Sequence, residues 1–383
     1  MKMSLVAALA LTAISVGYAS AQSGGAPACT GRNPHVAVPA APHGMFLWLY
    51  SLDAQRPLNL FKKYVIGKDP SLCGVSAVVV WSDVEKSRGS FDFSKVEQNL
   101  KPFVDAGLTV NLLFAAAGEG DTNTVTPPWV MAEVPATTCG GAKLPIYWNP
   151  KFEADWSAFI RRTTEYFSQK SPIRNQIGYL RFATGGGAEA VAPPGAYGGP
   201  CADALSKQGY SYDVWKAHTL RMLDAMGSAS TTHQLIAALP QVPGGKPRYD
   251  LPNTFAAAAA AKHIGLSFES LGAGNVTAPG TKPGPCQPAN LHWCETFKKY
   301  AGVVPLAMQP ITASENTNHG KIDISNLLQY ALINKIQVFE LYPDEWLEAN
   351  GATEWQPFVP ANQAKYKAAL QAASRVLGAA KIP

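Results

Sequence analysis

Eight short apolar segments, separated by segments with helical periodicity, constrain the fold of this chain most. Their residues are mainly Val, Ile, Leu, Phe, Tyr and Ala, and they cover residues 44–50, 75–81, 108–114, 177–183, 234–239, 263–269, 303–309 and 336–342. Such runs are typical of parallel strands that are buried on both faces. Eight strands alternating with helices predict an α/β fold, a single (β/α)8 TIM barrel.

The clearest β-α-β unit lies between residues 75 and 114. An apolar strand ends at Trp81, an acidic turn with a glycine follows, and a helix begins at Ser94 and stops at Gly107 before the next strand. The alternative is a doubly wound open sheet. No G-x-G-x-x-G motif follows the first strand to support a dinucleotide-binding version of that fold.

Three of the loops that follow predicted strands are long and rich in Gly, Pro and aromatic residues. They cover residues 115–149 after strand 3, 185–209 after strand 4 and 270–290 after strand 6. In an α/β barrel these loops form the C-terminal face, where active sites occur. The loops that enter the strands are short, as at residues 105–107, so we expect a deep cleft on one face.

The N-terminus has the features of a secretory signal peptide. A basic Lys2 precedes an apolar run over residues 5–16, and the A-x-A pattern at residues 19–21 is a cleavage signal. We therefore expect a signal peptide over residues 1–21, a Pro/Gly-rich leader over 22–42 and a barrel catalytic domain over 43–383. The protein is expected to be secreted, into the extracellular space or the periplasm, with no membrane-spanning segment.

A secreted chain with six cysteines is expected to form disulfides. The sequence alone leaves their pairing open. Placed on a barrel, the cysteines favour three bridges between neighbours: Cys29–Cys73, Cys139–Cys201 and Cys286–Cys294. No C-x-x-C or H-x-x-x-H spacing occurs, so we expect no metal site and no cofactor.

The charged residues indicate an ordinary protein surface. The formal net charge is +5 and only 15% of the residues are charged, with no basic run longer than a pair. Nucleic acid is therefore not an expected partner, and we expect a monomer. A serine hydrolase of the common kind and a P-loop protein are disfavoured, because their motifs are absent from the sequence.

Two motifs resemble those of (β/α)8 glycoside hydrolases. The segment from Trp81 to Phe93 reads W-x-x-x-E-x-x-x-G-x-F-D-F and is similar to the passage from strand 2 into its helix in that group. The segment R-F-A-T-G-G-G-A-E, which ends at Glu189, resembles the Gly-rich turn after strand 4 of the β-amylase family, whose Glu is the general acid. Ala188 stands where the retaining clan has the Asn of an Asn-Glu pair. The resemblance implies a glycoside hydrolase with Glu189 as the proton donor.

Glycoside hydrolysis also needs a second carboxylate near the scissile bond. In retaining enzymes of this fold the nucleophilic Glu ends strand 7, but this chain has Gln309 there, and Glu315 follows six residues later. Glu269, which closes strand 6, and Glu340, in strand 8, are the favoured candidates for nucleophile or base. The structural alternative for each is an ion pair with a buried cation such as Arg181.

Aromatic residues near the strand ends are typical of sugar binding, because flat rings stack on the apolar faces of pyranoses. We expect five residues to line sugar subsites: Trp48, Trp81, Arg181, Tyr342 and Trp346. The predicted activity is hydrolysis of O-glycosidic bonds in a poly- or oligosaccharide. The alternative is a barrel that binds carbohydrate without cleaving it. A lyase would need a cation or a Lys or Tyr base, and none is clearly placed.

Overall fold

The computed structural model describes residues 43–52, 55–118, 124–139, 142–193, 201–240, 250–271, 291–310, 323–355 and 358–379. The predicted signal peptide and leader, together with Cys29, Cys286 and Glu315, lie outside these ranges. Within them, every helix is too short or too polar to cross a lipid bilayer.

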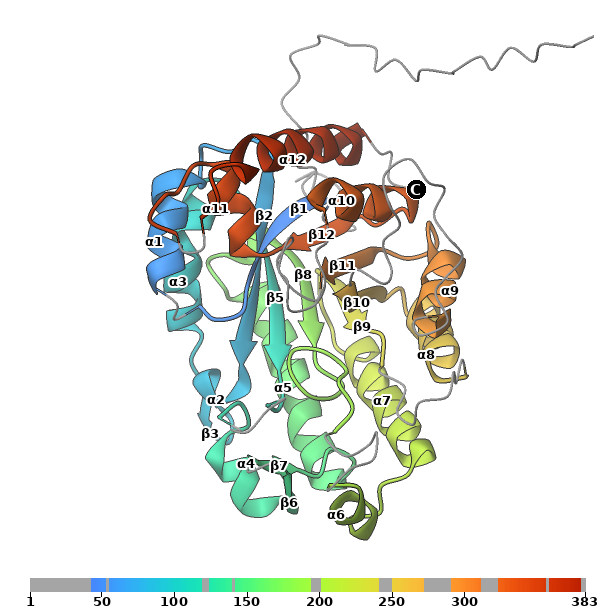
Figure 1. The fold of residues 1–383 in the computed structure, drawn as a ribbon. Coiled ribbons are helices and arrows are strands. Elements are labelled where there is room, and N and C mark those ends of the chain that lie inside the picture. Colours follow the sequence, from blue (N-terminus) through green and yellow to red (C-terminus); the bar gives the residue numbers. More distant parts are fainter. Residues whose placement is uncertain are drawn as a thin grey trace, which may run out of the picture.

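Eight parallel strands form a closed barrel, in which each strand pairs with the next barrel strand along the chain and the last pairs with the first (Figure 1). The predicted single α/β barrel is therefore confirmed, and each predicted strand overlaps an observed one. The largest shifts are at the second strand, which begins three residues earlier than predicted, and at the seventh, which begins three residues later. The strands are β1 Gly44–Leu49, β2 Leu72–Val80, β5 Thr109–Ala115, β8 Ile177–Phe182, β9 Gln234–Ala238, β10 Gly265–Leu271, β11 Leu306–Pro310 and β12 Val338–Leu341.

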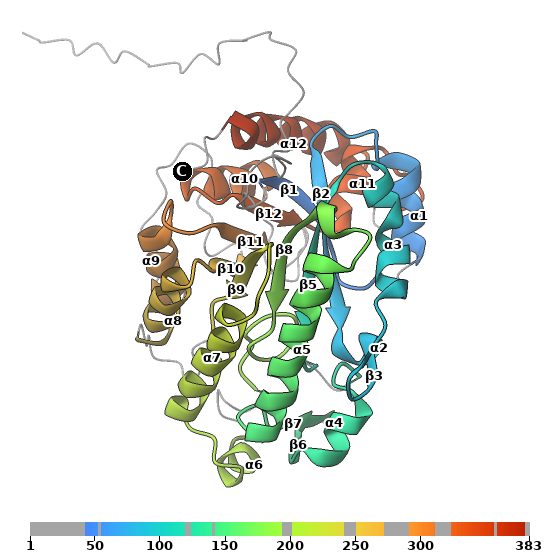
Figure 2. The ribbon, with the colours of Figure 1, turned by 180° about the vertical axis from the view of Figure 1, so that it is seen from behind.

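Helices cover the outside of the barrel (Figure 2). The longest of the early helices, α5, begins at Pro150 after Asn149, whose side chain accepts a hydrogen bond from the amide of Lys151 and so caps the helix. Helix α5 ends at Gln169. The other helices around the barrel are α1 Gln55–Tyr64, α3 Ser94–Asp105, α7 Tyr212–Gly227, α8 Asp250–Ala261, α9 Leu291–Tyr300, α10 Ile324–Ile333, α11 Pro343–Ala349 and α12 Asn362–Ala379.

The strands bury two apolar layers, one inside the barrel and one beneath the helices. Successive side chains of a strand point to opposite faces. In β12, Val338 belongs to the inner cluster, whereas Phe339 and Leu341 belong to the outer one. This is the alternation that the sequence predicts for this strand, and it directs Glu340 into the barrel.

Small elements cover the C-terminal end of the barrel, to which the arrowheads of β2, β5 and β8 point in Figure 1. The disulfide Cys139–Cys201 joins the loops after β5 and β8, as predicted. Cys73 and Cys294 are also disulfide-bonded, and their predicted partners lie outside the described residues. The small elements are α4 Pro128–Glu133, the hairpin β6 Ala136–Cys139 with β7 Ala142–Pro145, and α6 Ala202–Lys207.

Trp81 does not end the second strand as predicted. The strand stops at Val80, and Trp81 is the first residue of the short helix α2, Trp81–Val84, ahead of the hairpin β3 Glu85–Ser87 and β4 Ser90–Phe91. The indole is fully buried, packs 4.9 Å from the ring of Trp156, and donates a hydrogen bond of 2.7 Å to Glu85. The chain turns outward after β2, so this side chain belongs to the outer core.

Candidate functional site

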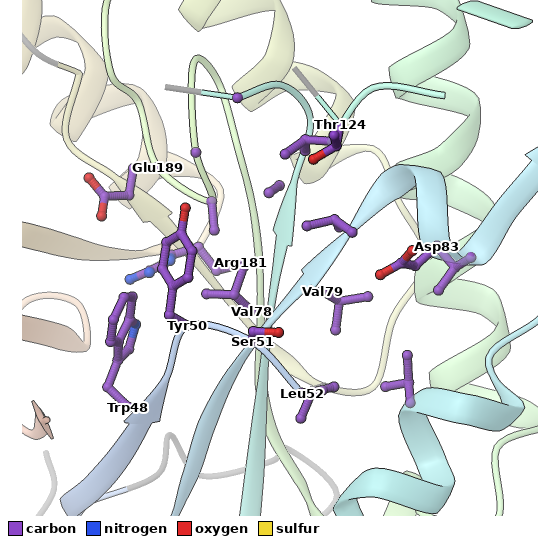
Figure 3. A pocket seen from close by; sticks show the side chains of 18 of the residues that line it. Trp48, Tyr50, Ser51, Leu52, Val78, Val79, Asp83, Thr124, Arg181 and Glu189 are labelled. Atoms are coloured by element: carbon purple, nitrogen blue, oxygen red, sulfur yellow. The ribbon is translucent and has the colours of Figure 1, made fainter. Parts of the chain in front are cut away.

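A cavity of about 730 Å³ lies at the C-terminal ends of the barrel strands (Figure 3). It takes side chains from the ends of β1, β2, β5, β8, β10 and β11 and from the loops that follow them. The residues of chemical interest in its lining are Trp48, Arg181, Glu189, Glu269, Gln309 and Tyr342. The predicted cleft on this face is therefore present.

Glu189 reaches the cavity from a tightly folded loop after β8. The amide of Thr184 donates to the carbonyl of Glu189 at 2.9 Å, and the amide of Gly186 donates to the carbonyl of Val191 at 2.9 Å. A Cβ atom at Gly185 would lie 2.4 Å from the Val191 carbonyl oxygen, so only glycine fits there. The Gly-rich motif thus has a steric cause, and the loop presents the half-buried Glu189 to the cavity.

Glu269 lines the same cavity and is held by two neighbours. Arg181 donates from Nη1 to Oε1 of Glu269 at 2.7 Å, and the hydroxyl of Ser267 donates to the same oxygen. Glu269 is 7% exposed and Arg181 only 1%. The ion-pair alternative is therefore confirmed for this residue, and the carboxylate still borders the cavity.

Glu340 lies inside the barrel and does not line the cavity. Its side chain is fully buried, accepts a hydrogen bond from the hydroxyl of Tyr179, and has Oε2 3.6 Å from Nη1 of Arg181. Burial raises the pKa of Tyr179 well above its usual value, and the charge of Glu340 raises it further, so the phenol stays protonated. Glu340 therefore binds Arg181 and Tyr179, and the alternative role of Glu340 as the partner of a buried cation is confirmed.

Arg181 is the centre of this charge network. Burial lowers the pKa of its guanidinium, but Glu269 and Glu340 raise it more, with a smaller contribution from Glu189, and the net shift is upward. Because these carboxylates come from strands far apart in the sequence, closure of the barrel brings them to one cation. Figure 3 shows Arg181 and Glu189 among the residues that line the cavity with Trp48 and Tyr50.

The aromatic residues divide into two groups. Trp48 and Tyr342 line the cavity with ring centroids 5.0 Å apart, and the 72%-exposed ring of Tyr50 lies 5.6 Å from that of Trp48. Trp81 and Trp346 are fully buried in the outer core and are not in the cavity lining. The expectation that these two line sugar subsites is corrected, because each lies in the first turns of a helix that faces the barrel wall.

The cavity also continues outside the barrel mouth, along the start of α3. Asp83, Asp92, Lys95 and Asn99 line this part. Hydrogen bonds from the hydroxyl and the backbone amide of Ser94 lower the pKa of Asp92. Asp83 belongs to the acidic turn after the second strand, and the F-D-F motif before α3 is the sequence signal that could have identified Asp92. Across the described part of the chain, no group of three or more His, Cys, Asp or Glu side chains is arranged to hold a metal ion.

Comparisons with known proteins support the fold. No protein-family model matches the chain, and no curated protein matches it. Among solved structures, a glycosylated endo-β-1,4-xylanase of glycoside hydrolase family 10 from Gloeophyllum trabeum has a TM-score of 0.50 at 12% identity, over 86% of this chain and 97% of that chain. The catalytic domain of β-amylase from Paenibacillus polymyxa has a TM-score of 0.49 at 13% identity, over 78% and 91%. The chain thus has the (β/α)8 barrel fold that is found in glycoside hydrolases.

Proposed function

We propose that this protein hydrolyses O-glycosidic bonds in a poly- or oligosaccharide. The single observation that carries the proposal is that two carboxylates, Glu189 and Glu269, line one cavity together with the rings of Trp48 and Tyr342. Two carboxyl groups at one site are the minimum for glycoside hydrolysis, and aromatic rings bind sugar faces. The xylanase with a similar barrel is consistent with this class of reaction.

In this mechanism Glu189 donates its proton to the glycosidic oxygen as the bond to the anomeric carbon breaks. Glu269 either attacks the anomeric carbon or removes a proton from the attacking water. Both roles require Glu269 as a carboxylate, and the charged hydrogen bond from Arg181 stabilises that form. Since Arg181 and Ser267 both bind Oε1, they orient the group, while Glu340 and Tyr179 position Arg181.

The second candidate is a barrel that binds carbohydrate without cleaving it. Two observations favour it. Gln309 lies near the end of β11, where retaining enzymes of this fold carry their nucleophile, and Glu269 is already paired with Arg181. An amide cannot serve as a nucleophile or base in place of a carboxylate. The two proposals therefore differ in whether Glu269 can replace the missing strand-7 carboxylate.

The test measures reducing-sugar release from a panel of plant and microbial glycans by the wild type, Glu189→Gln, Glu269→Gln and a surface control, Glu165→Gln. Glu165 pairs with Lys170 at 3.3 Å on the outside of α5, so its replacement is expected to leave activity unchanged. Loss of a general acid or base lowers the rate by about 100- to 10,000-fold. NMR of the first product then shows whether the anomeric configuration is retained or inverted.

Each outcome selects one proposal. Activity in the wild type that is lost in both cavity variants supports hydrolysis by Glu189 and Glu269. Activity that survives Glu269→Gln contradicts the role of Glu269. Glycan binding without release by the wild type rejects the enzyme and supports the binding barrel. Thermal unfolding of each variant shows whether a lost activity reflects a lost fold.

We also propose that the protein is secreted after cleavage of residues 1–21. The basic start, the short apolar run and the A-x-A pattern support this, and the Cys139–Cys201 disulfide fits an oxidising compartment. N-terminal sequencing of protein from the culture medium or periplasm is expected to begin at Gln22. Recovery of the uncleaved chain in the cytoplasm would reject the proposal.

A further inference from the structure

Three side chains in the cavity lining carry buried polar atoms without a hydrogen-bond partner. Trp48, Gln309 and Arg181 are 7%, 2% and 1% exposed. The unpartnered atoms are Trp48 Nε1, Gln309 Oε1, and Arg181 Nε and Nη2. Buried polar groups are normally paired, so a cluster of exceptions in one cavity points to a bound ligand that supplies the partners.

The three side chains offer a mixed set of donors and acceptors. The indole and the guanidinium can only donate, whereas the amide oxygen of Gln309 can only accept. The other end of that amide is already oriented, because its Nε2 donates to the hydroxyl of Tyr342 at 3.3 Å. Sugar hydroxyls both donate and accept, so adjacent hydroxyls on one ring can satisfy all three side chains.

The charges around the cavity act against an anionic ligand. Among the described residues, its charged lining consists of the acidic Asp83, Asp92, Glu189 and Glu269 and the basic Lys95 and Arg181. Arg181 is already neutralised by Glu269 at 2.7 Å, and Glu340 lies 3.6 Å from the same nitrogen. A ligand carboxylate or sulfate beside Arg181 would meet uncompensated negative charge at short range in a buried site.

We infer that Trp48, Arg181 and Gln309 form a subsite for the hydroxyl groups of an uncharged sugar, and that the ligands of this protein are neutral glycans. Uronic-acid polymers and sulfated glycans are excluded by the same charges. The inference rests on the proposed function only in taking a glycan as the ligand, because it concerns binding and not cleavage. Trp48 supplies both a ring for stacking and an N–H, so the two contributions can be separated by substitution.

The test is calorimetric binding to Glu189→Gln, which leaves the glycan intact. The probes are four neutral hexasaccharides (of xylose, β-glucose, α-glucose and β-mannose) and the hexasaccharide of galacturonic acid. At least one neutral probe is expected to bind at least about tenfold more tightly than the galacturonate. A second substitution in this variant, Trp48→Phe or Gln309→Ala, is expected to weaken the binding of that neutral probe by about 3- to 10-fold. This is the effect expected from the loss of one neutral hydrogen bond. Trp148→Phe is the control, because its indole donates to the carbonyl of Gln208 outside the cavity.

Three results would overturn the inference. They are tighter binding of the galacturonate than of every neutral probe, unchanged affinity in both Trp48→Phe and Gln309→Ala, and no binding of any probe. Failure of the hydrolase proposal is a separate result: the wild type would bind a neutral glycan, with these substitutions weakening it, and release no reducing sugar. In that case the inferred subsite is supported, and the protein is a barrel that binds carbohydrate without cleaving it.

Discussion

Replacement of Arg181 by methionine is the perturbation whose effect the structure defines best. The guanidinium is buried and faces two carboxylates, at 2.7 Å for Glu269 and 3.6 Å for Glu340. Methionine fills similar volume but leaves both acids unpaired in the barrel. Removing one partner of a buried ion pair costs about 3–5 kcal/mol, and with two acids left unpaired we expect the upper end of that range. That loss is about a third or more of a total stability of about 5–15 kcal/mol.

The charge origin of this loss is tested by removing the acids as well. In Arg181→Met with Glu269→Gln and Glu340→Gln, no buried charge is left unpaired, so most of the lost free energy of unfolding is expected to return. Arg221→Met is the matched control: its guanidinium is paired with the carboxylate of Glu153 by two hydrogen bonds, at 2.7 and 2.8 Å, but is 48% exposed. Its loss is expected to be about 0–1 kcal/mol.

The assay is urea unfolding at pH 7. A loss below about 1 kcal/mol at pH 7 for Arg181→Met would refute the reasoning. An equal loss in the triple variant would also refute it, because the cost would then arise from packing.

Three further predictions concern the scaffold. Gly74→Ala is expected to cost about 1–3 kcal/mol or more, because the new Cβ would lie 2.0 Å from the carbonyl oxygen of Thr109 in the neighbouring strand. Replacing Cys139 and Cys201 with serine is expected to cost up to about 4 kcal/mol, from the chain entropy of a loop with a sequence separation of 62. Burial lowers the pKa of His218 below 6.5, so the unfolded chain binds its proton more readily and stability is expected to fall as the pH drops below about 6.5.

Unfolding measurements test each of these three predictions. Gly227→Ala is the control for Gly74, because its Cβ would meet only the flexible chain of Lys262, and equal losses in urea unfolding would contradict the steric argument. For the disulfide, an unchanged melting temperature in the double serine variant would contradict the entropy argument. For His218, His218→Gln is expected to flatten the stability profile between pH 7 and pH 5, and an unchanged slope would contradict the assignment.

Local sequence accounts for much of the site. The steric demand of the Gly-rich turn, met by Gly185 against Val191, can be anticipated from three consecutive glycines, and Glu189 follows from it. Strand alternation likewise predicts that Glu340 points inward. Trp81 and Trp346 were misplaced because a strand end and the first turn of a helix look alike in composition, and only packing against the barrel wall distinguishes them.

The pattern of apolar runs predicts the barrel, because it decides which segments become buried strands. The same pattern shows that Glu189, Glu269 and Glu340 lie in or after these strands. How these carboxylates are paired depends on the closed barrel. Arg181 contacts Glu269 and Glu340 across the barrel, although these two residues lie 88 and 159 positions farther along the chain. An ion pair depends on the distance between two side chains in space, and strand order and barrel closure determine that distance. A strand depends instead on the side chains of residues that are neighbours in the sequence.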